Sequence, residues 1–166
     1  MRRFLGAFIV LVLAAVALPL QAQQTIEITE ADLDRYMELV QADVLNGRAD
    51  LVGEAMQFGA DESATFWPLY TEYDKAVQEI GQQRWALIKD FAASYEMMTD
   101  EAAEDLIERA FAIRQERMDV QREFARTVAG ALGPQIAARF IQVDNQIKNL
   151  LDLQIAMQLP LIQKPQ

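Results

Sequence analysis

The sequence predicts an all-α fold, with four antiparallel helices dominated by a long helical hairpin in a cradle-like or elongated bundle. After residue 30 the apolar residues recur about every 3.5 residues, and no stretch keeps the strict alternation of a strand. The chain has 166 residues, of which 52% are apolar and 24% charged. These values indicate one packed domain rather than a disordered chain.

The N-terminal segment, 1–22, has the pattern of a secretory signal peptide. Two arginines precede an apolar run over Phe4–Leu20, and Pro19 and Ala22 favour cleavage after Ala22, which would leave Gln23 as the new N-terminus. An uncleaved membrane anchor remains the alternative, because a run of this length is at the short limit for crossing a bilayer. We expect export to the periplasm, with no stable membrane insertion after cleavage.

Charge and composition restrict the partners and the chemistry. Cleavage would change the formal net charge from −10 to −12, because the leader carries Arg2 and Arg3 and no acidic residue. Nucleic acids and anionic lipids repel such a protein, so we expect neutral, basic or apolar partners. The chain has no cysteine and no histidine, which excludes thiol chemistry, histidine bases and histidine metal ligands. We therefore expect neither a cofactor nor enzymatic activity.

A flexible stretch, 23–29, is expected to precede a single helical domain over 30–158. The first helix is predicted over about 30–57, and the dipeptide Asn46-Gly47 could divide it. Its apolar stripe is predicted to be Leu33, Met37, Val40, Val44, Leu51 and Ala55.

The second and third helices are predicted over about 61–95 and 100–132, each about 50 Å long, with Thr99 as the N-cap of the third. The predicted second seam is Phe66, Tyr70, Tyr73, Val77, Ile80, Arg84, Leu87, Phe91 and Tyr95. The predicted third seam is Leu106, Ala110, Ile113, Arg117, Val120, Phe124 and Val128. An antiparallel turn near Met97-Met98 would place Tyr70 opposite Phe124. So slender a hairpin is expected to dimerise or to leave an apolar concave face.

The fourth helix is predicted to follow Gly133-Pro134, since glycine suits a helix end and proline a first turn. Its seam is predicted to be Ile136, Phe140, Val143, Ile147 and Leu150. The helix should stop before Pro160. The tail, 159–166, begins with four residues too apolar to be left in water, so we expect it to pack on the body.

An aromatic segment in the second helix is the first candidate site. Phe66, Trp67 and Tyr70 are candidates for contact with a partner or client, and Pro68 should kink the axis there. Trp67 points about 100° away from the core stripe. It is either part of an exposed binding patch or a second packing face against the first helix or the tail, and the packing interpretation is favoured.

Charged residues divide the third helix into an acidic and a basic half. Glu101, Glu104, Asp105 and Glu108 are weak candidates for a calcium or magnesium site, although acids in a first turn are ordinarily solvated and matched to the helix dipole. The basic half includes three further candidates for partner binding, Arg114, Arg117 and Arg122. Two copies packed antiparallel would match acidic to basic halves, which predicts an antiparallel homodimer.

Two helix starts resemble each other and a known family. The stretches 59–63 (Gly-Ala-Asp-Glu-Ser) and 98–102 (Met-Thr-Asp-Glu-Ala) are similar to degenerate Leu-Thr-x-x-Gln motifs of the Spy/CpxP superfamily. A poorly characterised branch is more similar, through its Phe-Trp-Pro-x-Tyr segment at 66–70 and its Ala-Arg-Phe-x-Gln helix at 138–142.

This resemblance implies a periplasmic four-helix cradle that tends to form antiparallel dimers. The roles known in the superfamily are ATP-independent chaperoning, inhibition of envelope-stress sensing, and metal sensing. We therefore expect a chaperone-like protein that binds unfolded or envelope proteins. The alternatives are a structural or signalling accessory that docks one specific envelope protein and, more weakly, a carboxylate-based metal sensor.

Overall fold

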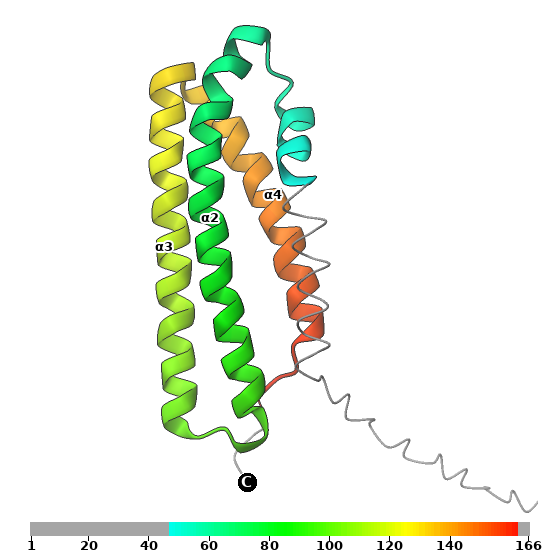
Figure 1. The fold of residues 1–166 in the computed structure, drawn as a ribbon, viewed down its shortest axis with the longest axis vertical. Coiled ribbons are helices and arrows are strands. Elements are labelled where there is room, and N and C mark those ends of the chain that lie inside the picture. The colour runs from blue at the N-terminus through cyan, green and yellow to red at the C-terminus, as the bar shows by residue number, and fades with distance from the viewer. Residues whose placement is uncertain (1–46, 163–166) are drawn as a thin grey trace, which may run out of the picture.

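A computed structural model describes residues 47–162, which are helical almost throughout and contain no strand. A helical segment over 47–56 precedes α2 (Ala60–Ser94). A short 3-10 turn, η1 (Tyr95–Met97), then leads to α3 (Asp100–Leu132) and α4 (Pro134–Gln158). As Figure 1 shows, α2 and α3 form a long antiparallel hairpin, with α4 and the first segment beside it. The predicted all-α hairpin architecture is confirmed.

Several predictions concern residues outside this described range. They are the signal peptide over 1–22, the stretch over 23–29, the part of the first helix before residue 47, and the end of the tail. These stay predictions.

Local hydrogen bonds explain where α2 and α3 begin. The Glu62 carboxylate accepts a hydrogen bond of 3.0 Å from the Gly59 backbone N–H, which closes the first turn of α2. Thr99 is the N-cap of α3, as predicted, and its hydroxyl oxygen accepts from the Ala102 N–H at 3.2 Å. Pro68 lies inside α2, which continues as one helix on both sides of it.

Gly133 and Pro134 separate α3 from α4, as the sequence predicts. Gly133 has a φ of 94°, which favours glycine over residues with a Cβ. Its N–H donates to the Ala129 carbonyl and so ends α3, while Pro134 occupies the first turn of α4.

The core is an aromatic cluster at the end of the molecule where α3 turns into α4. The Phe124 ring stacks on Tyr73 with 4.3 Å between centroids and meets Phe140 edge-on at 4.8 Å. Phe66 and Phe140 are completely buried. Val52 and Met56, from the first segment, cover this cluster from the side. Burial of aromatic area is the main stabilising contribution here.

The predicted pairing of α2 and α3 is correct in direction and shifted along the axis. The rings of Tyr70 and Phe124 are 6.4 Å apart, as that pairing requires, but Phe124 stacks more closely on Tyr73. Farther along, Arg109 donates to Asp90 at 2.6 Å. This contact places the pairing about one helical turn from the predicted register.

Two predicted packing positions, Leu51 and Leu150, are wrong. Leu51 is 51% exposed, whereas Val52 is completely buried, so the buried face of the segment over 47–56 lies one position on from the predicted stripe. In α4 the buried positions are Ala137, Phe140, Asp144 and Ile147. These positions are separated by steps of three and four residues, and the next step of four leads to the half-buried Leu151. Leu150 therefore lies off this face and is 65% exposed.

The tail also differs from the prediction. The Leu161 side chain is 91% exposed. The segment is attached through its backbone instead, because the Tyr95 hydroxyl donates to the Leu161 carbonyl at 3.1 Å.

Candidate functional site

A buried carboxylate, that of Asp144 on α4, organises the most polar part of the interior. Its side chain is completely buried and accepts hydrogen bonds from three elements. Arg117 and Gln121 of α3 each donate at 2.7 Å, and the Tyr73 hydroxyl of α2 donates at 2.8 Å. Arg48, from the segment over 47–56, forms an ion pair with the same carboxylate. We call these five residues the Asp144 cluster.

The electrostatics of this cluster keep Asp144 ionised. Burial alone would raise the pKa of Asp144, but Arg117 and Arg48, together with the hydrogen bond from Tyr73, outweigh it and hold the pKa below its ordinary value. Burial raises the pKa of the Tyr73 hydroxyl, and the nearby Asp144 charge raises it further. The hydroxyl therefore stays protonated and remains a donor.

A second carboxylate balances the charge of the two arginines. Arg48 also pairs with Asp74 at 3.3 Å, and Asp74 accepts from Gln78 at 2.8 Å. The guanidinium carbons of Arg48 and Arg117 lie 5.7 and 5.3 Å from the centroid of the Tyr73 ring. Two cations, two carboxylates and an aromatic ring are thus packed together, an arrangement that fixes the relative position of four segments.

The C-terminal half of α4 is attached to α2 by a more exposed ion pair. Arg84 of α2 pairs with Asp152, which Lys148 also contacts at 2.6 Å. The side chains of Arg84 and Asp152 are 39% and 33% exposed. This contact therefore holds α4 to α2 less firmly than the Asp144 cluster does.

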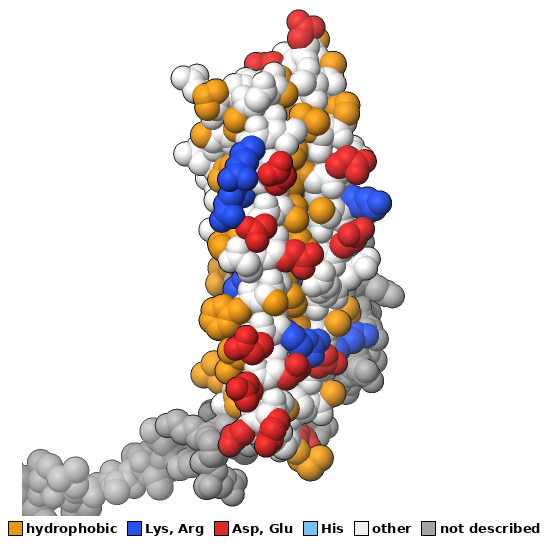
Figure 2. Space-filling model, turned by 90° about the vertical axis from the view of Figure 1, so that its left-hand side faces the viewer, with side chains coloured by type: hydrophobic (Ala, Val, Ile, Leu, Met, Phe, Trp, Pro, Cys, Tyr) orange, Lys and Arg blue, Asp and Glu red, His pale blue; other side chains and the backbone are white. Residues whose placement is uncertain are grey.

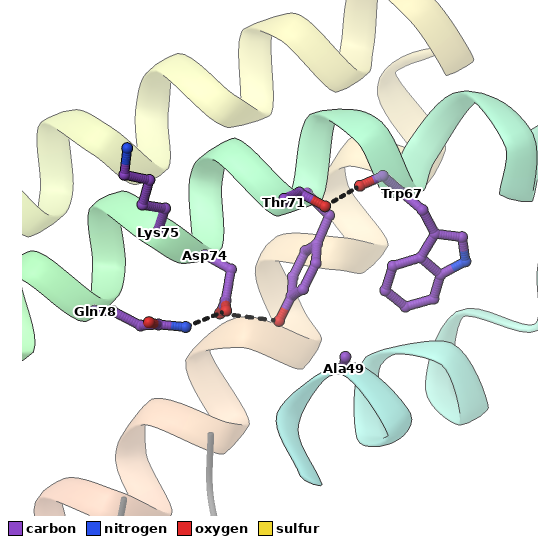
Figure 3. Close-up of a pocket in the computed structure, with 7 residues that line it drawn as sticks. Ala49, Trp67, Thr71, Asp74, Lys75 and Gln78 are labelled. Carbon is purple, nitrogen blue, oxygen red and sulfur yellow. Dashed lines mark hydrogen bonds between the residues drawn. The ribbon is translucent and has the colours of Figure 1, made fainter. Parts of the chain in front are cut away.

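An open pocket lies between the segment over 47–56 and α2 (Figure 3). Its volume is about 310 Å³. The Trp67 indole forms one side and donates to the Ser63 hydroxyl at 2.9 Å. A Cβ placed on Gly53 would begin 3.4 Å from the Trp67 ring, so the first segment packs directly on the indole. This placement agrees with the packing interpretation of Trp67.

Three candidate residues for partner binding lie inside the molecule. Phe66 is completely buried and Tyr70 is 3% exposed, because both belong to the aromatic core. The Arg117 side chain is 12% exposed and pairs with Asp144. Their assignment to a binding surface is wrong for this folded chain. All three residues lie on the predicted seams of α2 and α3, and these seams face the interior.

The other two arginine candidates, Arg114 and Arg122, lie on the surface of α3. The guanidinium carbon of Arg114 lies 5.5 Å from the centroid of the Phe111 ring. Arg122 forms a local ion pair with Asp119 at 2.6 Å. Both therefore remain candidates for contact with a partner.

The four acidic candidates lie exposed along the first turns of α3, namely Glu101, Glu104, Asp105 and Glu108. Asp105 forms an ion pair with Arg109 at 3.0 Å. Within residues 47–162 no group of three or more carboxylates converges as metal ligands would. The weak metal interpretation has no geometric support in this range.

Large apolar side chains are exposed on the outer side of α3. Ile107, Phe111 and Met118 are 53%, 61% and 50% exposed, and their spacing places them on one face. Figure 2, a view onto this side of the molecule, shows hydrophobic side chains along its length between charged ones. More are exposed near the end of α4, namely Leu150, Leu153 and Met157.

An apolar groove of about 370 Å³ lies between α2 and α3. We call it the α2–α3 groove. Its lining residues are Pro68, Leu69, Glu72, Tyr73, Ala76, Val120, Glu123, Phe124 and Thr127.

Sequence reasoning missed Asp144 and Arg48. A signal was present, because Arg84 and Arg117 interrupt otherwise apolar seams. A charged residue on a seam requires a buried partner of opposite charge. Asp144 lies four residues after Phe140, on the same face of α4, and would have been the natural partner.

Comparison with known proteins gives no relative: the chain matches no family model, no curated protein and no solved structure. Within the described helices, none combines the length and apolar character that a membrane crossing requires.

Proposed function

We propose that this chain is an exported, non-enzymatic accessory protein that binds unfolded or envelope proteins in a chaperone-like manner. The observation that carries the proposal is the exposed row of Ile107, Phe111 and Met118 on the outer side of α3. Exposed apolar residues gathered on one face are typical of an interaction surface. The resemblance of two helix starts to the Spy/CpxP superfamily points in the same direction.

The chemistry of this row suits varied partners. Apolar contact is not directional, and methionine adapts its shape to irregular surfaces. The high net negative charge of the chain keeps the molecule soluble while these side chains are exposed.

An aggregation-suppression assay tests the proposal. The purified protein should suppress aggregation of several unrelated unfolding proteins at near-stoichiometric ratios. Phe111→Ser with Met118→Ser should reduce that suppression. Leu51→Ser, at an exposed apolar residue outside the row, is the matched control and should leave it unchanged. Absence of suppression by the unmodified protein would defeat the proposal.

A second candidate function is an accessory that docks one specific envelope protein. The Asp144 cluster favours it, because this buried network fixes four segments relative to one another. A body held rigid in this way presents a preorganised surface, which suits a single partner. In that case suppression should be absent, and crosslinking in cells should yield one dominant partner.

The proposed location rests on the predicted signal peptide. Mass spectrometry of the periplasmic fraction should give a mature N-terminus at Gln23. An intact Met1 terminus on membrane-bound protein would instead support an anchor.

A further inference from the structure

The α2–α3 groove has an apolar base and walls of small or half-buried residues. Tyr73 and Phe124 form its base as a stacked pair. Pro68, Ala76 and Thr127 line it without filling it. Its volume of about 370 Å³ lies within the usual range of ligand sites and would accommodate a large apolar side chain.

The rims of the groove are acidic. Glu72 on α2 and Glu123 on α3 belong to its lining. Helical spacing places Glu79 on the same rim as Glu72, and Glu116 on the same rim as Glu123. Glu116 accepts from Gln83 across the hairpin at 3.4 Å, so these rims continue below the groove on one face.

The carboxylates of Glu72, Glu79 and Glu123 are solvent-exposed and can exchange partners. Glu123 pairs with Arg126 at 3.5 Å, with both side chains about 70% exposed. Such a contact contributes little free energy, so a ligand cation can replace it.

From this geometry we infer that the α2–α3 groove binds a cationic amphipathic segment of another polypeptide. One apolar side chain of the segment occupies the space above Tyr73 and Phe124. Lysine or arginine side chains on either side of it pair with Glu72, Glu79 and Glu123. The inference goes beyond the proposed function, because the groove is a different site from the exposed row on α3 and would bind one class of segment.

Charge complementarity selects this occupant over a second copy of the chain. The chain carries a net charge of −10, so most surfaces of a second copy would meet the acidic rims with like charge. A cationic segment is attracted instead, and the apolar groove gives its anchor a defined position.

Fluorescence anisotropy with the full chain tests the inference. The probe is a fluorescein-labelled peptide of leucine and lysine arranged in a helical period. A matched peptide carries glutamate at each lysine position. At about 0.15 M salt the lysine peptide should bind and the glutamate peptide should not, and higher salt should weaken binding.

Two pairs of variants locate the site. Glu72→Gln, Glu79→Gln and Glu123→Gln together should weaken binding about ten-fold, since three exposed ion pairs are lost. The control with the same change of charge is Glu101→Gln, Glu104→Gln and Glu108→Gln, which should stay within about two-fold of the unmodified chain.

Ala76→Phe fills the groove and should abolish the remaining affinity, whereas Ala93→Phe, on an exposed part of α2, should not. Circular dichroism confirms that each variant is folded. Equal weakening by both glutamine triples would overturn the inference, because the attraction would then be diffuse. Loss of self-association rather than peptide binding in the groove variants would also overturn it, since the occupant would be a second copy.

The two proposals fail separately. If the chain suppresses aggregation and the groove variants bind the lysine peptide normally, the groove inference is wrong and the proposed function stands. If the groove binds the peptide and no client is protected, the groove inference stands and the chaperone-like function is wrong.

Discussion

At the scale of single residues, Asp144 controls the interior because two guanidinium groups depend on one carboxylate. The side chains of Arg48 and Arg117 are only 7% and 12% exposed, so water cannot solvate their guanidinium groups in place of the carboxylate. Removing one member of a buried pair leaves the other charge uncompensated, which destabilises much more than the pair itself stabilises.

Asp144→Asn is therefore expected to lower the free energy of unfolding by about 3–5 kcal/mol. Urea denaturation followed by circular dichroism would measure it. Asp152→Asn is the matched control, because its ion pair with Arg84 is partly exposed, and it should cost less than about 1 kcal/mol. Equal effects of the two substitutions would contradict the central position of Asp144.

The lowered pKa of Asp144 also predicts how stability depends on pH. A carboxyl whose pKa is lower in the folded state contributes stability above its ordinary value of 3.8, and that contribution is lost as pH falls through the folded pKa. The unmodified chain should thus lose stability steeply below about pH 4, and Asp144→Asn should show a shallower loss. Parallel pH profiles for the two proteins would show that Asp144 does not contribute.

At the scale of the helices, Phe124 joins all of the long elements. Its ring contacts Tyr73 of α2 at 4.3 Å and Phe140 of α4 at 4.8 Å. Phe124→Ala should lower the free energy of unfolding by about 3–5 kcal/mol, since it leaves a cavity among aromatic rings. The control Phe111→Ala, at a position 61% exposed, should change it by no more than about 0.5 kcal/mol.

The helices were predictable because their signals are local. The Thr99 cap, the Gly133-Pro134 boundary and the seams of α2 and α3 follow from spacing and from residue type. The buried Asp144 cluster could not be predicted in this way, because Arg48 and Asp144 are 96 positions apart in the sequence. Spacing along one helix fixes which face is buried and carries no information on which distant residue that face meets.

At the scale of the whole molecule, the divided charge of α3 supports a proposed antiparallel homodimer. A test of the dimer by charge reversal should leave Arg117 unchanged, because its side chain lies in the interior and pairs with Asp144. Arg114→Glu with Arg122→Glu should weaken self-association without unfolding the chain. The association should also weaken with salt, since exposed ion pairs are screened. Sedimentation that shows a monomer at low salt would contradict the dimer.

The Asp144 cluster has a consequence for the order of folding. The hairpin of α2 and α3 closes through a short turn, whereas Arg48 reaches Asp144 only after a loop of 96 positions has closed. We expect the hairpin to form in the rate-limiting transition state and the Arg48 segment to dock afterwards.

Arg48→Met should then speed unfolding and leave the folding rate nearly unchanged, while Phe124→Ala should slow folding. Stopped-flow kinetics would separate the two, and slower folding of Arg48→Met would show that docking comes early. If docking is late, the first segment is also the part of the bundle that opens first, and Arg48 sets the lifetime of the closed molecule.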